Sequence, residues 1–214
     1  MRVEGSPPSA SSTAFNATPL TGTVLSGGVD LNTTSKFILI SDTIPFGTSL
    51  NAVSTPPTGW RVVYSESSTT TLPNTADKAV WSTTPPANLT TVTRVGFVYA
   101  PLTPTGLLTN AVNSPAIAPN TNITGFSFVV RTTTTFGSNG TTGGQIANIA
   151  QVFGTSNGGT TLVYDESGDQ TPSNFNDAGT STTGSNTPRN GVATPGTDGT
   201  DPGNNTGTDT NTSL

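Results

Sequence analysis

The amino-acid sequence predicts an all-β fold, an antiparallel β-sandwich flanked by an extended N-terminal arm and by a C-terminal tail rich in Gly, Thr, Asn and Asp. Three observations support this prediction. Short apolar runs recur along the chain, turn residues separate them, and the straight-chain residues that favour helices are scarce. Thr, which is abundant, suits a pleated strand, and Asn and Gly suit the turns between strands.

Seven runs are the best strand candidates, and further weak candidates lie within Thr13–Leu31. The seven cover Phe37–Ser41, Trp60–Ser65, Ala79–Ser82, Val92–Tyr99, Gly125–Thr132, Gln145–Phe153 and Thr160–Tyr164. The side chains of Trp60, Val62 and Tyr64 alternate onto one face, as expected for a strand with one buried side. Seven such strands with frequent turns are typical of an antiparallel sandwich.

Composition divides the chain into three parts. Residues 1–24 begin with a Ser/Pro-rich stretch and are predicted to form an arm, with the alternative role of a strand donated to a neighbour. Residues 25–164 form the sandwich, and residues 165–214 form an acidic low-complexity tail. Seven acids and one base give the tail a charge of 1 − 7 = −6, whereas six bases and five acids give residues 1–164 a charge of 6 − 5 = +1.

The absence of histidine and cysteine excludes several function classes. The chain can build neither a Ser-His-Asp nor a Cys-His pair, and it lacks the usual zinc ligands and any disulfide. No pattern fixes two carboxylates in one pocket, so the sequence predicts that the protein is not an enzyme. There is no basic patch for nucleic acid and no apolar run of transmembrane length. The first residues lack an apolar segment, so a secreted form is expected to have lost its leader or to be a piece of a larger precursor.

The start of the acidic tail is the candidate metal site. Oxygen-bearing side chains gather there around glycine, as a Ca²⁺ site requires, although the spacing is not that of an EF-hand. The candidate ligands are Asp165, Glu166, Asp169, Asn174, Asn176 and Asp177. The alternative interpretation is a solvated acidic turn. Calcium is the only cofactor that the sequence suggests.

Some polar and aromatic residues inside the predicted strands have a structural and a functional interpretation. Asp42 follows a strand and is predicted to cap the next turn. Asn148 lies between apolar neighbours and is predicted to point inward and to bond the backbone. The aromatic residues Trp60, Tyr64, Trp81 and Tyr99 could form a platform for sugars, but core packing is the favoured interpretation in a domain with two tryptophans.

Two segments resemble a known family. Residues 38–48 read Ile-Leu-Ile-Ser-Asp-Thr-Ile-Pro-Phe-Gly-Thr, and residues 144–152 read Gly-Gln-Ile-Ala-Asn-Ile-Ala-Gln-Val. They resemble the Asp-Thr-(apolar)-Pro-x-Gly block and the closing strand of a prokaryotic conserved-repeat family of unknown function in surface proteins. The acidic segment 164–177 is similar to cyanobacterial members. The resemblance implies an immunoglobulin-like sandwich, so the predicted fold class is an all-β, antiparallel immunoglobulin-like β-sandwich. It supplies no active site.

One departure from that family bears on assembly. The family's opening strand corresponds here to residues 21–34, which are short of apolar residues. The opening strand is therefore either displaced to residues 13–24 or missing. A missing strand would leave a sheet edge unpaired, and the arm of a neighbouring copy could fill it.

The sequence therefore predicts an extracellular or cell-surface structural protein, a subunit or repeat of a filament, sheath or surface layer. Its expected partners are other copies of itself or neighbouring surface-protein repeats, joined by strand or edge complementation. The alternative is an adhesin or carbohydrate-binding module of a larger cell-surface protein, with glycans as partners.

Overall fold

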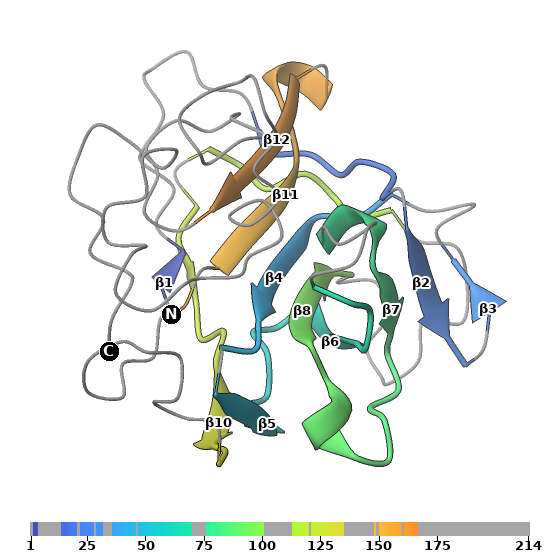
Figure 1. Cartoon of the computed structure of the whole chain (residues 1–214). Helices are drawn as coiled ribbons and strands as arrows, with labels where there is room; N and C mark the ends of the chain where they lie inside the picture. The colour runs from blue at the N-terminus through green and yellow to red at the C-terminus, as the bar shows by residue number, and fades with distance from the viewer. Residues whose placement is uncertain are drawn as a thin grey trace, which may run out of the picture.

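The all-β prediction is confirmed, and the sheets are mostly antiparallel. The protein was analysed as a computed structural model (Figure 1). The structure describes residues 2–3, 14–20, 22–27, 29–31, 36–45, 47–69, 76–100, 113–119, 121–134, 148, 150–159 and 161–166. Within these residues the only helical elements are three 3-10 turns, η1 (Ala76–Lys78), η2 (Leu89–Thr91) and η3 (Asn157–Gly159). None of the helices in the described part of the chain is long and apolar enough to cross a membrane.

Twelve strands are present in the described residues, and most are short. They are β1 (Arg2–Val3), β2 (Thr23–Ser26), β3 (Val29–Asp30), β4 (Leu39–Thr43), β5 (Thr48–Val53), β6 (Trp60–Ser65), β7 (Val80–Ser82), β8 (Arg94–Tyr99), β9 (Ile123–Thr124), β10 (Phe128–Thr132), β11 (Ala150–Ser156) and β12 (Thr161–Glu166). Strand β6 has the predicted bounds, and the predicted boundaries after residues 24 and 164 fall inside β2 and β12.

Eight of these strands form one large sheet in the order β12-β11-β4-β8-β6-β7-β2-β3. Every pair in it is antiparallel except β2 and β7, which run parallel with Val24 opposite Trp81. The central strands β4 and β8 are joined by five residue pairs, from Leu39 opposite Val98 to Thr43 opposite Arg94. Two separate two-stranded sheets, β1 with β9 and β5 with β10, complete the described strands.

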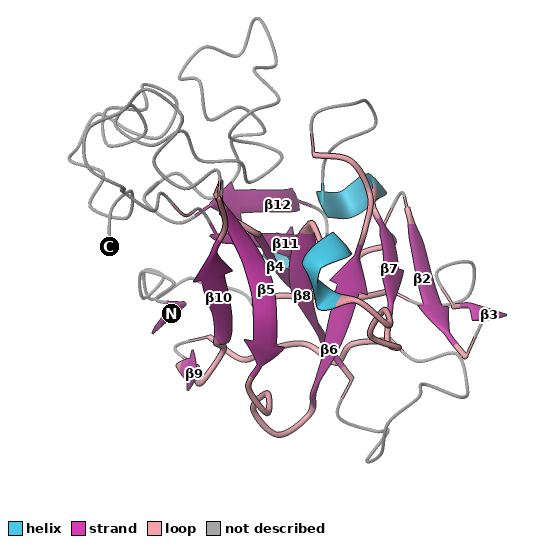
Figure 2. Ribbon diagram, turned by 60° about the horizontal axis from the view of Figure 1, so that its bottom comes forward, coloured by secondary structure: helices cyan, strands magenta, loops and turns pink. Residues whose placement is uncertain are grey.

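The antiparallel pair β5 and β10, here called the ribbon, covers one face of the large sheet (Figure 2). The ribbon contributes Leu50 to a buried cluster that also comprises Ile38, Ile40, Trp60, Val92, Val95, Phe97 and Phe126. Trp60 and Phe126 meet edge to face with ring centroids 4.8 Å apart, and the Phe97 ring lies 5.1 Å from Phe126. Such aromatic pairs add about 0.5–1.5 kcal/mol to the burial of their area.

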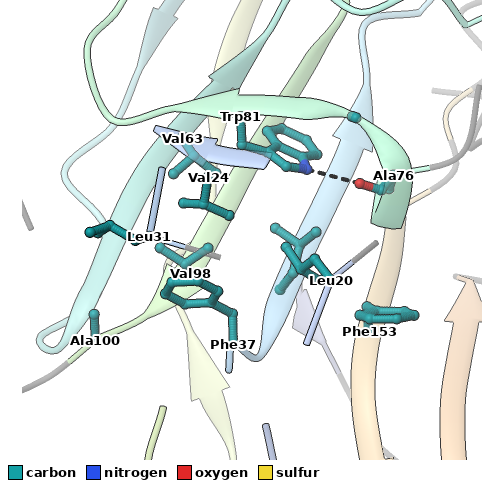
Figure 3. Packing of buried hydrophobic residues seen from close by; sticks show 12 residues of the cluster. Leu20, Val24, Leu31, Phe37, Val63, Ala76, Trp81, Val98, Ala100 and Phe153 are labelled. Atoms are coloured by element: carbon teal, nitrogen blue, oxygen red, sulfur yellow. Dashed lines mark hydrogen bonds between the residues drawn. The ribbon is translucent and has the colours of Figure 1, made fainter. Parts of the chain in front are cut away.

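The opposite face of the large sheet is also covered by buried apolar side chains (Figure 3). Its buried cluster comprises Leu20, Val24, Leu31, Phe37, Leu39, Val63, Ala76, Ala79, Trp81, Val98, Ala100 and Phe153. The fully buried Trp81 donates its indole N–H to the carbonyl of Ala76 at 2.8 Å. Gly96 makes room for this ring, because a Cβ there would lie 2.9 Å from Trp81 and 2.8 Å from Val63.

Coverage of both faces explains why strict alternation fails in the central strands. All five residues of β4 are buried, including the polar Ser41 and Asp42.

The sequence analysis also missed β5, whose residues Thr-Ser-Leu-Asn-Ala-Val provide little apolar surface. Only Leu50 of β5 is fully buried, and pairing with β10 rather than apolar content makes this segment a strand.

Candidate functional site

The N-terminal segment of residues 14–20 and 22–26, here called the strap, begins wedged between two strands of the large sheet. The backbone of Asn16 exchanges both hydrogen bonds with Thr155 of β11, at N–O distances of 2.7 and 2.8 Å. Two residues later, Thr18 exchanges both hydrogen bonds with Phe37, just before β4, at 3.1 and 2.9 Å. The strap therefore occupies the place where β11 and β4 separate beyond Phe153 and Leu39.

Glycines at two positions allow the strap and the rest of the domain to approach each other closely. A Cβ on Gly154 of β11 would lie 2.5 Å from the Phe15 ring, so only glycine admits that ring. A Cβ on Gly22 would lie 2.2 Å from the carbonyl oxygen of Ala79. The Gly22 amide donates to the carbonyl of Asp77 at 2.7 Å, and the next amide donates to that of Ala79. The strap is thus held by the Phe15 ring at Gly154 and by its backbone at Gly22.

Beyond Gly22 the strap becomes strand β2 and completes the cluster around Trp81. The side chains of Leu20 and Val24 are buried at 4% and 0% exposure. The Val24 amide donates to the carboxylate of Asp30 at 3.2 Å, and its carbonyl accepts from the amide of Leu31. The strap thus spans the sheet from β11 to β7 and contributes Leu20 and Val24 to the hydrophobic cluster on this face.

A second surface feature is a hollow of about 330 Å³ beside β6 and β7. Its lining residues are Leu25, Tyr64, Glu66, Ser67, Val80, Ser82, Thr84 and Pro86. Burial raises the pKa of the Tyr64 hydroxyl. The Glu66 carboxylate accepts a hydrogen bond from the Thr91 hydroxyl, and Val80 is 49% exposed. The hollow combines an aromatic ring, an acid, hydroxyls and apolar surface.

The four aromatic residues considered as a sugar platform do not lie on one surface. Trp60 and Trp81 are buried on opposite faces of the large sheet, which confirms the core interpretation for both. Tyr99 packs on Trp60 with the ring centroids 5.0 Å apart. Only Tyr64 belongs to the hollow.

Asp42 and Asn148 were predicted to have structural roles, and the structure pairs their side chains. Asn148 donates its amide N–H to Oδ2 of Asp42 at 2.8 Å. The prediction that Asp42 caps the next turn and that Asn148 bonds the backbone was therefore wrong about the partners. Burial raises the pKa of Asp42 from 3.8 to about 8, and the hydrogen bond from Asn148 opposes this rise. Sequence spacing could not reveal the pair, because the residues are 106 positions apart.

Sequence analysis also missed the buried guanidinium of Arg94 on β8. Arg94 has 0% exposure, and its Nη1 donates to the carbonyls of Ser67 at 3.4 Å and Ser68 at 3.3 Å. Five of the six residues of β8 are buried, so the strand has no exposed face from which the burial of Arg94 could have been predicted. These two hydrogen bonds tie the chain after β6 to β8.

The predicted calcium ligands lie at the margin of the described chain. Asp165 and Glu166 are the last two residues of β12, opposite Val152 and Gln151 of β11. The other four candidates, Asp169, Asn174, Asn176 and Asp177, lie outside the described residues. Among the residues that the structure does describe, no three acidic side chains come together as a metal site requires. Calcium binding stays a prediction.

Comparison with known proteins gives one match. A family model described as "Domain of unknown function (DUF7925)" matches residues 1–175. No curated protein matches the chain significantly, and neither does any solved structure. The match agrees with the predicted resemblance to a family of unknown function, and it carries no information on repeats, immunoglobulin-like topology or a cyanobacterial type.

Proposed function

We propose that this chain, which belongs to the DUF7925 family of domains of unknown function, is an extracellular structural subunit that assembles with copies of itself into a surface filament, sheath or layer. The observation that carries the proposal is the strap. It enters between β11 and β4, crosses to β7 and completes one hydrophobic face of the sheet. An element of this kind can be supplied by the same chain or by its neighbour.

Strand exchange would keep the contacts of the strap unchanged. Its backbone hydrogen bonds to Thr155, Phe37 and Ala79 do not depend on which copy provides them. Only the connection between Leu31 and Lys36, the four residues Asn-Thr-Thr-Ser, would have to reach a different body. Exchange of an identical element between protomers is a low-cost route to association, and a short connection favours it.

The remaining properties of the chain suit such an assembly. Charged residues make up 9% of the sequence, and residues 1–164 carry six bases and five acids. Electrostatic repulsion between the bodies of closely packed copies is therefore weak. The large sheet also ends at β12, a six-residue strand whose single partner among the described residues is β11. An unpaired strand edge is a second surface through which copies can associate. The immunoglobulin-like topology and the surface location are parts of the same proposal.

A cysteine pair tests strand exchange directly, because the natural chain has no cysteine. Asn16 and Thr155 form a hydrogen-bonded antiparallel pair, in which Cα atoms are about 5.5 Å apart and within the range that a disulfide spans. The variant Asn16→Cys/Thr155→Cys is assembled, oxidised and run on a non-reducing denaturing gel. We expect a ladder of covalent multimers, because each disulfide would join two copies.

The matched control is Thr48→Cys/Thr132→Cys, a register pair within the ribbon. This disulfide should form within one chain, so the control should run as a monomer whether or not the protein assembles. Polymers of the Asn16→Cys/Thr155→Cys variant that dissolve to monomers on the same gel would rule out exchange of the strap. A wild-type chain that electron microscopy shows only as separate particles under all assembly conditions would rule out the structural function.

A second candidate is an adhesin or carbohydrate-binding module, which the hollow beside Tyr64 favours. An aromatic ring next to a carboxylate and hydroxyl groups is the combination that can stack on a sugar and bond its hydroxyls. The same electron microscopy separates the two functions. Ordered polymers support the structural subunit, whereas monodisperse monomers that bind glycans, with binding lost in Tyr64→Ala, support the module.

A further inference from the structure

The pair formed by Asp42 and Asn148 leaves two buried oxygen atoms without a hydrogen bond. Oδ2 of Asp42 accepts from the Asn148 amide, but Oδ1 of Asp42 and Oδ1 of Asn148 have no partner. Asp42 is only 2% exposed, so bulk water does not reach its carboxylate. A buried acceptor that is left unpaired costs about 1–3 kcal/mol, and an isolated buried carboxylate costs more.

A single proton on the Asp42 carboxyl group can give both unpaired oxygen atoms a hydrogen bond. A neutral carboxylic acid has one donor and one acceptor, as the carboxamide opposite it does. If Oδ1 of Asp42 carries the proton, it can donate to Oδ1 of Asn148 while Oδ2 accepts from the Asn148 amide. The two side chains then form a closed ring with two hydrogen bonds, and no charge is buried.

We propose that Asp42 is held as the neutral acid and that its proton clasps Asn148, just before β11, to the end of β4. The clasp lies beside the last backbone pair of these strands, Ala150 opposite Asp42. The clasp therefore joins β11 to β4 at one end of their paired region, and the strap lies between the two strands at the other end. Ionisation of Asp42 would break one hydrogen bond and leave a charge in the apolar interior.

The surroundings of Asp42 favour the neutral form. Val95 of β8 and Ala150 of β11 lie opposite it in the two neighbouring strands. The described residues of β4 and β11 contain no other charged side chain. Successive side chains of a strand point to opposite faces of the sheet. Arg94 precedes Val95 in β8, so its side chain points to the face opposite Asp42. The positive charge of the chain's amino terminus is the smallest influence on Asp42 and favours ionisation, while burial dominates.

The clasp predicts a specific pH dependence of stability. The pKa of Asp42 rises from 3.8 to about 8 on folding, so between these values the folded chain holds a proton that the unfolded chain releases. The stabilisation is complete at pH below 3.8 and is lost progressively as the pH rises to about 8. Within this window the unfolding equilibrium constant should increase up to about tenfold per pH unit relative to a variant without the acid.

The test compares the full chain with Asp42→Asn, which keeps both hydrogen bonds as an amide–amide ring but cannot ionise. Denaturant unfolding from pH 4 to 9 should give a ratio of unfolding constants, wild type over Asp42→Asn, that rises with pH and levels above pH 8. Val129→Thr, which changes an exposed position of the ribbon and removes no ionisable group, should leave the shape of the wild-type profile unchanged. Parallel profiles of wild type and Asp42→Asn would overturn the proposal.

A measurement on the wild type alone protects the test against a variant that does not fold. Infrared spectroscopy of the folded chain should show the carbonyl band of a protonated carboxylic acid at pH 6, where ordinary Asp and Glu are ionised. The band should disappear with a midpoint near the pKa of about 8. A folded chain without this band at pH 6 would show that Asp42 is ionised and that no clasp exists.

Discussion

The two faces of the large sheet are closed in different ways. On one face the ribbon of β5 and β10 is itself an antiparallel pair, which satisfies its backbone before it packs. On the other face the backbone bonds of the strap are spread over many partners, which are β11, Phe37, Ile117, η1, Ala79, β7 and β3. A ribbon needs the sheet only for its apolar side chains, whereas a strap needs it for hydrogen bonds as well.

This difference indicates which side of the molecule can open. An opened ribbon keeps its internal ladder, so opening exposes apolar surface but few unpaired backbone groups. An opened strap exposes the cluster around Trp81 and also leaves amides and carbonyls on both partners unpaired. Such a surface is stable only when a strand covers it, which is why the strap, and not the ribbon, is the element through which we expect copies to join.

The largest expected effect comes from the two buried tryptophans, one on each face. Trp81→Ala and Trp60→Ala should each cost about 3–5 kcal/mol of unfolding free energy, because both side chains are almost fully buried. Hydrogen exchange should separate the two faces. Trp81→Ala should speed the exchange of the Gly22 and Thr23 amides, and Trp60→Ala that of the Ser54 amide, which bonds Ser127 beside the ribbon. Equal acceleration at all three amides in both variants would show that the two faces open as one unit.

The second effect compares two glycines that are needed for different reasons. Gly22→Ala would place a Cβ 2.2 Å from the backbone oxygen of Ala79, and overpacking of this kind costs about 1–3 kcal/mol. Gly125→Ala has open space, with its nearest contact 3.6 Å away, but its φ of +98° costs about 1–2 kcal/mol for a residue with a side chain.

Denaturant unfolding measures both changes. We expect the Gly22 variant to be the less stable and to lose protection of β2 first. If Gly125→Ala proves the more damaging, the strap tolerates displacement better than its close contacts indicate.

The smallest effect serves as a control for the comparison. Val80 and Val129 are exposed at 49% and 50%, on β7 and on the ribbon. Val80→Thr and Val129→Thr should each change the unfolding free energy by less than about 0.5 kcal/mol, because neither removes a buried contact. A thermal melt of each variant suffices, and a large loss from Val129→Thr alone would show that a partner covers the ribbon.

Much of the fold was predictable because strand-forming segments have a local signature. Trp60, Val62 and Tyr64 alternate as predicted and pack on the ribbon face. The candidate sites were less predictable. Gly22 and Gly154 look like turn residues in a chain with 24 glycines, and only the close approach of Phe15 and Ala79 gives them their role. The pairing of Asp42 with Asn148 joins distant parts of the chain, and no local pattern encodes it.

The sequence by itself determined that the chain builds strands and that it has no histidine or cysteine, because residue types and their alternation are local properties. Only the tertiary structure decided which segments became neighbours. It buried β4 on both faces, seated the strap between β11 and β4, and placed one carboxyl group against one carboxamide. Such placements follow from the packing of the whole chain, where the gain from filling a face outweighs the preference of any single segment.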